Sequence, residues 1–129
     1  MKIKDNNNES KWWIIDWKSN FLINEDHKGS IPLSYNYENM RLEMIRHHYP
    51  LQSHLYLLAV HRLLKWRLHN YNPQKDLGGY IYIFLRGLPD ISSKNEINLK
   101  NDMPGIFIGS APIRRIKYLD NLFKNGTKS

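Results

Sequence analysis

The order of apolar and polar positions along the chain predicts a mixture of strands and helices. Residues Trp12–Ser19 are dense in Trp and Ile, which favours a β-strand. Between Asn36 and His48 apolar residues recur at helical spacing, and Asn36 has the side chain of a helix N-cap. The longest helical pattern covers Leu51–Leu68, and Pro50 is suited to the first position of that helix.

One broad side of this long helix is expected to face the core. The apolar residues that share it are Leu51, Leu55, Leu58, Val60, Leu63 and Leu64. The polar residues expected on the other side are His54, His61, Arg62, Lys65 and His69. The spacing therefore predicts an amphipathic helix with a basic outer face.

Two more strands and a helix are predicted in the second half of the chain. Tyr80–Leu85 is aromatic and β-branched, which is typical of a buried strand, and Gly105–Gly109 is a shorter candidate. Turn residues fill 70–79, and a polar loop is expected over 89–104. The last helix is expected to carry apolar positions at Ile113, Ile116, Leu119 (or Asp120) and Phe123. This order of elements predicts an α/β fold in a single domain.

Composition narrows the function classes. The chain has 129 residues and a formal net charge of +7, which suggests nucleic acid, acidic lipid or an acidic protein as partner. The absence of cysteine excludes disulfides, thiolate zinc sites and cysteine nucleophiles, and it fits a cytoplasmic location. No run approaches the roughly 18 apolar residues of a membrane helix, so no spanning segment is expected.

The first predicted strand carries the most informative polar residues. Side chains alternate along a strand, so Asp16 and Lys18 are expected on one face with Cα atoms roughly 6.5–7 Å apart, and Trp17 is expected on the opposite face, which should help to hold the strand in a core. A carboxylate is a suitable oxygen ligand for Mg²⁺, and a nearby ammonium can orient a water or offset charge on phosphorus. The simpler interpretation is a weak, exposed ion pair at a strand end.

The long helix supplies further candidates. Gln52 and Tyr56 are four residues apart on one helix face, where an amide, a hydroxyl and an aromatic ring could contact a phosphate, a water or a base. A helix start with one buried Tyr is the simpler interpretation of this pair. His54, His61 and Lys65 could follow a phosphate backbone, although a solvated polar face accounts for them as well.

Three ordered segments together resemble a known family. Trp12–Asn20 (WWIIDWKSN), Tyr49–Arg62 (YPLQSHLYLLAVHR) and Leu77–Gly87 (LGGYIYIFLRG) are similar to the C-terminal nuclease domain of the exodeoxyribonuclease V beta subunits, RecB. Met103–Phe107 resembles the short strand that follows in that domain. The resemblance covers about residues 12–124, and three motifs in this order are far more specific than any one of them.

The resemblance implies a fold, a reaction and roles for single residues. The fold is the restriction-endonuclease-like fold of the PD-(D/E)xK nucleases, a mixed sheet flanked by helices. By the same resemblance, residues 1–129 would be a single partial domain that is incomplete at its N-terminal strands. The reaction is Mg²⁺-dependent hydrolysis of DNA, at linear duplex ends and on single strands, in recombination and repair. By resemblance, Asp16 and the backbone carbonyl of Trp17 would be metal ligands, and Lys18 the catalytic lysine. Gln52 and Tyr56 match a Gln-x-x-x-Tyr motif that supports DNA and the active site.

The sequence also departs from that family. Its catalytic centre uses a second Asp on the preceding strand, roughly a dozen residues before the Asp-x-Lys acid, and a His further upstream. Here the corresponding position is Ile3, and the nearby acids Asp5 and Glu9 fall in the expected turn between two strands of a hairpin. A phosphate-binding Gly-x-x-x-x-Gly-Lys-Ser/Thr loop is absent from the sequence. These departures lead us to expect a truncated or split beta subunit without its helicase part.

Three hypotheses follow. The chain is half of a Mg²⁺ nuclease site that is completed by another fragment, with the remaining beta-subunit portion and the gamma and alpha subunits as partners. Alternatively, it is a catalytically inert module that binds DNA or docks on a helicase subunit. A third hypothesis is a decayed gene product without a present role.

Overall fold

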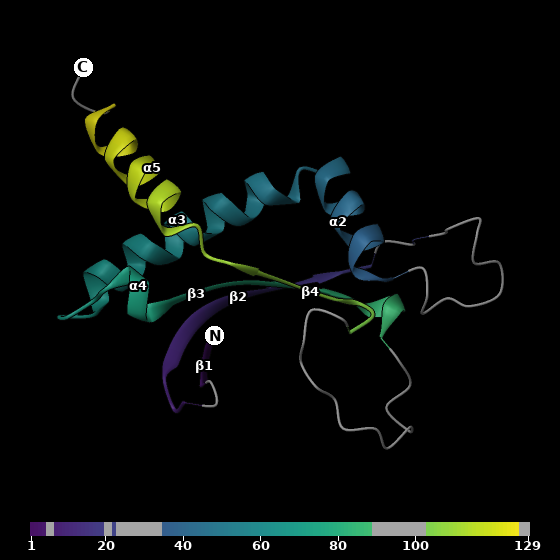
Figure 1. Ribbon diagram of the computed structural model, residues 1–129. Coiled ribbons are helices and arrows are strands. Elements are labelled where there is room, and N and C mark those ends of the chain that lie inside the picture. The colour runs from purple at the N-terminus through teal and green to yellow at the C-terminus, as the bar shows by residue number, and fades with distance from the viewer. Residues whose placement is uncertain (5–6, 20–21, 23–34, 89–102, 127–129) are drawn as a thin grey trace. The chain divides into compact units, whose positions relative to one another are not determined.

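The computed structural model describes residues 1–4, 7–19, 22, 35–88 and 103–126. They group into two units that share the longer strands. Unit 1 comprises Met1–Ile14, Pro50–Tyr80 and the segment from Gly109 onward, and unit 2 comprises Ile15–Tyr49 and Ile81–Ile108. Figure 1 shows the helices and strands along the chain.

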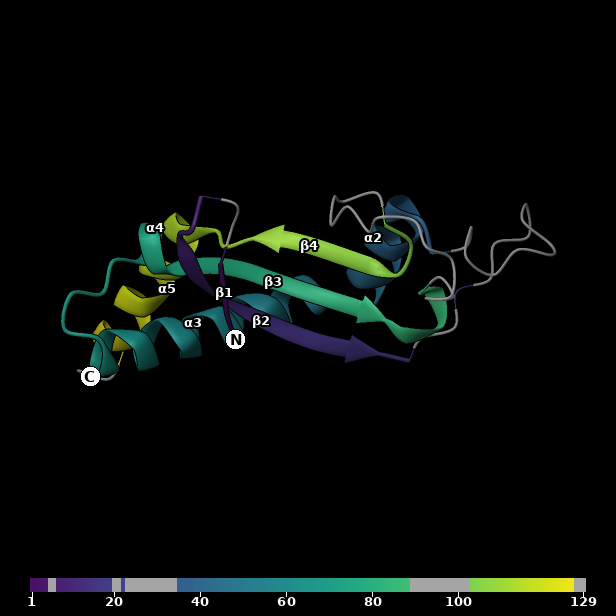
Figure 2. The ribbon, with the colours of Figure 1, turned by 90° about the horizontal axis from the view of Figure 1, so that it is seen from below.

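A four-stranded mixed sheet underlies both units. Its strands are β1 (Lys2–Lys4), β2 (Ser10–Lys18), β3 (Leu77–Phe84) and β4 (Ile106–Ser110). They lie in the order β1-β2-β3-β4, and Figure 2 shows β3 between β2 and β4. With helices flanking the sheet, the α/β class predicted from the sequence is confirmed.

The hairpin expected before the Asp-x-Lys motif is present in unit 1. β1 pairs antiparallel with β2, with Ile3 opposite Lys11 and Lys4 opposite Ser10. Glu9 lies in the segment that connects the two strands, as expected, whereas Asp5 lies outside the described residues. In this register β1 places no carboxylate beside Asp16.

Two helices form the core of unit 1 with the sheet. They are α3 (Tyr49–Arg67, of which Tyr49 belongs to unit 2) and α5 (Ile113–Asn125), and the short α4 (Pro73–Asp76) contributes no buried residue. The buried cluster consists of Leu57, Leu58, Leu64, Leu77 and Ile116, with Trp12 and Ile14 of β2 packed against it. The predicted turn over 70–79 thus contains a short helix, because Asn72 caps the N–H of Gln74 and Pro73 occupies the first turn.

The predicted inner face of α3 is wrong in part. Leu51, Leu55 and Leu63 were expected in the core but are exposed by 63%, 47% and 51%. Ser53 and His61 are buried instead. The reason is that both polar side chains find partners inside the protein: the Ser53 hydroxyl donates to the carbonyl of Pro50, and His61 contacts Tyr71 and Asp120.

Unit 2 has a core rich in aromatic side chains. Helix α2 (Tyr37–Arg46) begins after Asn36, whose side chain accepts a hydrogen bond from the N–H of Asn39, so the predicted N-cap is confirmed. The largest buried side chains of the unit are Tyr35, Met40, Met44, Tyr82, Phe84 and Phe107. A 3-10 turn, η2 (Leu85–Gly87), follows β3 and packs Gly87 directly under the Tyr35 ring.

Most predicted element boundaries agree with the structure to within a few residues. The polar loop over 89–104 lies almost entirely outside the described residues. None of the helices in the described part of the chain has the length and apolar character needed to cross a membrane.

Candidate functional site

The strand β2 places Asp16 and Lys18 together in unit 2, as the alternation of side chains predicted. Lys18 Nζ lies 2.7 Å from Asp16 Oδ2. The Lys18 side chain is only 12% exposed and that of Asp16 27% exposed. The simple alternative of a fully solvated ion pair therefore does not describe this pair, which is sheltered on one side and open to solvent on the other.

Two aromatic rings enclose the Lys18 ammonium. Its Nζ lies 4.0 Å from the centroid of the Tyr49 ring and 5.1 Å from that of Tyr82. The two rings stack at 5.6 Å, and the Tyr82 hydroxyl donates to the Tyr49 carbonyl at 3.2 Å. Because an ammonium is attracted to the face of an aromatic ring, the arrangement holds the charge in place while Asp16 neutralises it.

A hydrogen bond from η2, the turn that follows β3, holds the end of β2. Arg86 of η2 donates from Nε to the carbonyl of Ser19 at 3.1 Å. Trp17, expected to anchor the strand in the core, is 60% exposed, so that expectation is wrong. The anchoring residues are instead Trp12 and Ile14, which pack against the core of unit 1. The predicted metal contact of Trp17 uses its backbone carbonyl and stays a prediction.

The oxygen atoms around Asp16 are of the type that binds Mg²⁺, but the described residues provide too few of them for a complete metal site. Carboxylate and carbonyl oxygens are the ligands that Mg²⁺ prefers, and Asp16 has a partly exposed carboxylate whose Oδ2 is paired with Lys18. Among the residues that the structure describes, no group of three or more His, Asp or Glu side chains could hold a metal ion. Any ion at Asp16 would therefore need ligands from residues outside this set.

The first turns of α3 bring Gln52 and Tyr56 into contact. Gln52 Nε2 donates to the Tyr56 hydroxyl at 3.3 Å, which confirms that the two side chains share one helix face. Tyr56 is 45% exposed, so the interpretation as a buried structural Tyr is wrong. Gln52 is partly exposed, and the predicted contribution of the two residues to the site of Asp16 and Lys18 stays a prediction.

The three basic candidates of α3 differ from one another. His54 is half-buried, and its Nδ1 faces the carbonyl of Pro50. Lys65 is exposed, as the polar outer face requires. His61 is 4% exposed and lies in the interior of unit 1, so its expected place on the polar face is wrong. The predicted DNA contacts of all three stay predictions.

Sequence reasoning missed a buried carboxylate on α5. Asp120 is 3% exposed and accepts a hydrogen bond from Arg62 Nε to its Oδ1 at 2.7 Å. Its Oδ2 lies 3.6 Å from His61 Nε2, 3.6 Å from Lys65 Nζ and 3.5 Å from Lys124 Nζ. The only signal in the sequence was helical spacing, which left Leu119 and Asp120 as alternatives for one inward position.

The surroundings of Asp120 shift the pKa values of its neighbours. Burial raises the pKa of Asp120, but the Arg62 hydrogen bond and the charges of Lys124 and Lys65 outweigh burial and leave it below its usual value. Burial lowers the pKa of His61 despite the attraction of Asp120. Burial, with a smaller effect of the Asp76 charge, raises the pKa of Tyr71 to about 12.

These shifts define the protonation of the cluster near neutral pH. The pKa directions favour a neutral His61 and a protonated Tyr71. Asp120 is ionised and can only accept, so the tautomer that suits the cluster carries its N–H on Nε2, 3.6 Å from Asp120 Oδ2. In this tautomer Nδ1 accepts from the Tyr71 hydroxyl, which lies 2.9 Å away. An Asp–His–Tyr sequence of this kind resembles a catalytic relay, but a nucleophile needs a lowered pKa, and that of Tyr71 is raised.

In a comparison with curated proteins, the most similar relatives all carry the same name. The chain is 35% identical over 115 residues to "RecBCD enzyme subunit RecB" of Haemophilus influenzae, an alignment that covers 88% of this chain. It is 31% identical over 119 residues to the protein of the same name from Escherichia coli K12, covering 92% of this chain. The RecB subunit of Mycobacterium tuberculosis is 29% identical over 116 residues, or 90% of the chain. No family model matches.

The alignments cover only a small part of each relative. They span 8% of the Haemophilus protein, 9% of the Escherichia protein and 10% of the Mycobacterium protein. The chain thus spans about a tenth of the length of the curated relatives it matches. The resemblance inferred from the three sequence motifs is confirmed by these alignments.

Proposed function

Because this chain is a relative of the RecB subunits, we propose that it supplies part of the site of a DNA nuclease, with Asp16 and Lys18 as reacting residues. The observation that carries the proposal is the sheltered ion pair at the end of β2, 2.7 Å between Lys18 Nζ and Asp16 Oδ2. Desolvation offsets much of the attraction within such a sheltered pair, so stability alone gives little reason for its presence. The proposed reaction is hydrolysis of a phosphodiester in linear DNA.

Mg²⁺ is the proposed cofactor. Asp16 and the backbone carbonyl of Trp17 would hold it, because both offer hard oxygen ligands. When bound, the ion would polarise the phosphodiester and lower the pKa of a water. The ligands that Asp16 lacks would come from another segment of a larger assembly, formed with the rest of a beta subunit and with gamma and alpha subunits.

Lys18 has a role of its own in the proposed reaction. Its ammonium would orient the attacking water or offset the negative charge that develops on the phosphate. The contacts with Tyr49 and Tyr82 keep this charge in one place before DNA arrives. Catalysis gains from such preorganisation, since no reorganisation is needed during the reaction.

Gln52 and Tyr56 are proposed to hold the DNA strand. The two side chains meet on α3, where Gln52 Nε2 donates to the Tyr56 hydroxyl at 3.3 Å, and Tyr56 is 45% exposed. The amide of Gln52 would contact a phosphate or the attacking water, and the exposed Tyr56 ring would stack on a base. His54 is proposed to contact the same DNA strand.

A chimera tests the proposal most directly. The segment of Escherichia RecB that aligns with this chain would be replaced by the chain, and degradation of linear duplex DNA would be measured in the assembled enzyme with Mg²⁺ and with EDTA. We expect Mg²⁺-dependent degradation that falls by about 100-fold or more in Asp16→Asn and Lys18→Gln. Lys4→Gln, an exposed lysine on β1, is the matched control and should leave the rate unchanged.

The isolated chain provides a second test. With one carboxylate at the proposed metal site, we expect weak or no cleavage on its own. Rapid Mg²⁺-dependent degradation of linear duplex DNA by the isolated chain, abolished by Lys18→Ala, would contradict this expectation. A folded, assembled chimera that fails to degrade DNA would overturn the proposed reaction itself.

The inert binding module is the second candidate function. It is favoured by the +7 charge and by apolar side chains on the outer face of α3, of which Trp66 is 76% exposed. Such a surface suits DNA phosphates or docking on another subunit. DNA binding that is unchanged in Asp16→Asn and Lys18→Ala, combined with an inactive chimera, would support this candidate over the nuclease.

A further inference from the structure

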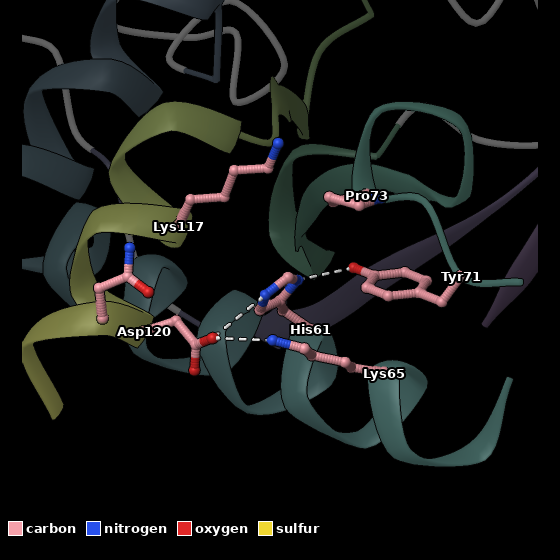
Figure 3. A pocket seen from close by; sticks show the side chains of 7 residues that line it. His61, Lys65, Tyr71, Pro73, Lys117 and Asp120 are labelled. Atoms are coloured by element: carbon pink, nitrogen blue, oxygen red, sulfur yellow. Dashed lines mark hydrogen bonds and ion pairs between the residues drawn. The ribbon is translucent and has the colours of Figure 1, made fainter. Parts of the chain in front are cut away.

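A cleft of about 280 Å³ opens in unit 1 beside the buried carboxylate of α5. Figure 3 shows His61 and Lys65 of α3 on one side, Lys117 and Asp120 of α5 on the other, and Tyr71 with Pro73 closing one end. Its lining also includes Asn121. The volume is close to the lower limit of about 300 Å³ for small-molecule pockets, which suits one phosphate group with part of its sugar.

The cleft carries more positive charge than its single carboxylate can neutralise. Arg62, Lys65 and Lys124 all reach Asp120, and the two ammonium groups lie 3.6 Å and 3.5 Å from the same oxygen. Lys124 lowers the pKa of Lys65, which is the effect of two cations crowded together. The carboxylate is 3% exposed and engaged on both oxygens, so little of its charge faces an incoming anion.

The outer wall of the cleft holds two polar side chains that the buried cluster does not use. Lys117 and Asn121 are four residues apart on α5, so they share a helix face, and both are exposed. No carboxylate in the described part of the chain pairs with Lys117. An ammonium and an amide N–H at this spacing are donors for the oxygens of one phosphate.

We propose that this cleft binds a phosphate group of a nucleic-acid strand, with Lys65, Lys117 and Asn121 as its donors. The inference rests on the proposed function, to which it adds a phosphate-binding site in unit 1. His61 and Tyr71 form the floor: each satisfies the other's hydrogen bond and neither carries charge. Asp120 positions Lys65 and does not touch the ligand.

Binding of DNA to the full chain in EDTA tests the cleft without cleavage. The probe is a fluorescein-labelled single-stranded 12-mer, followed by anisotropy at several NaCl concentrations. We expect Lys117→Gln to weaken binding about fivefold and to lower the slope of log Kd against log salt by about one, as for the loss of one phosphate contact. Lys117 is chosen because it forms no ion pair with Asp120, so its removal leaves the buried cluster intact.

The matched control is Arg115→Gln, which removes one charge from the same helix. Arg115 is exposed and lies two residues from Lys117, on nearly the opposite side of α5. We expect it to change the affinity less than twofold. Equal effects of Lys117→Gln and Arg115→Gln would overturn the proposal, because they would show a diffuse charge effect and no cleft. If cleavage by the chimera still depends on Asp16, the proposed function survives that outcome.

The side-chain amide of Asn121 reports on the ligand itself by nuclear magnetic resonance. Inorganic phosphate and the DNA 12-mer are each expected to shift it in the wild-type chain, phosphate at higher concentration, and in Lys117→Gln each shift is expected to need about fivefold more ligand. A shift by phosphate alone would assign the cleft to a free anion and overturn the nucleic-acid proposal, as would an equal shift by a hexaglutamate peptide at the concentration of the DNA. No shift with any of the three probes would also overturn it.

Discussion

The ammonium of Lys18 lies 4.0 Å from the centroid of the Tyr49 ring. An aromatic face thus covers the charge that is proposed to act on phosphate, and Asp16 neutralises it from the other side. The ammonium is held by two contacts of different kinds, an ion pair with Asp16 and a cation–π contact with the Tyr49 ring. The pair is therefore prepared for a substrate before one binds.

Loss of the Tyr49 ring should make Lys18 more reactive. In Tyr49→Leu we expect acylation of Lys18 to become about two- to fivefold faster, which corresponds to the ~0.5–1 kcal/mol of a cation–π contact. Peptide mass spectrometry after brief treatment with an amine-reactive ester measures the rate, with the exposed Lys75 as internal standard. Tyr118→Leu removes a 65% exposed Tyr elsewhere and should change nothing. The arrangement would be refuted by a wild-type Lys18 that reacts as fast as Lys75.

Local patterns were sufficient to predict most elements of this fold, although the short helix α4 was expected to be a turn. The Trp and Ile residues of β2, the N-cap at Asn36 and the spacing of Asp16 and Lys18 each depend on neighbours within a few positions, and the structure agrees with all of them. Alternation along one strand was enough to bring the carboxylate and the ammonium together. The rings around Lys18 come from distant parts of the chain, so no local pattern indicated them.

The inner face of α3 shows where local patterns fail. The helix has apolar residues on several sides, so the sequence alone does not select one face. The selection is made by polar partners far along the chain: Arg62 and Asp120 are 58 positions apart, and His61 and Tyr71 are ten apart. These partners allow His61 to be buried, and Leu63 is turned outward as a consequence.

Two leucines of α3 test this orientation. Leu57 is fully buried, and Leu57→Ala is expected to lower the free energy of unfolding by about 2–5 kcal/mol, because it leaves a cavity. Leu63 is 51% exposed, and Leu63→Ala should change it by less than about 0.5 kcal/mol. Urea denaturation of both variants measures the difference. Equal losses would mean that the orientation of the helix is different from the one described.

Asp120 is expected to stabilise unit 1 through its four basic neighbours. In Asp120→Asn, Arg62, Lys65 and Lys124 would repel one another without a counter-charge. We expect a loss of about 1–3 kcal/mol, less than for a fully buried ion pair, because the three cations are half exposed and water can solvate them. Thermal unfolding measures this loss. Glu38→Gln removes a carboxylate from an exposed pair with Arg41 and should cost little.

His61 and Asp120 should make stability depend on pH in two separate ranges. The pKa of His61 is lower in the folded chain than the ordinary 6.5, so the unfolded chain binds its proton first as the pH falls. The contribution of neutral His61 to the free energy of unfolding is therefore fully present above about pH 6.5 and is lost as the pH falls below that value. The pKa of Asp120 is also lowered, and its contribution is lost only below the ordinary carboxyl range, as the pH falls through the folded pKa.

Urea denaturation between pH 5 and pH 7.5 separates the His61 effect from general acid sensitivity. The wild-type chain should become less stable across this range as the pH falls, and His61→Gln should flatten the profile, since the side chain no longer titrates. His69→Gln is the matched control, because His69 is exposed and lies beyond the end of α3. A wild-type profile that is already flat, or an equal flattening by His69→Gln, would show that the His61 ring titrates in the folded chain as it does in water.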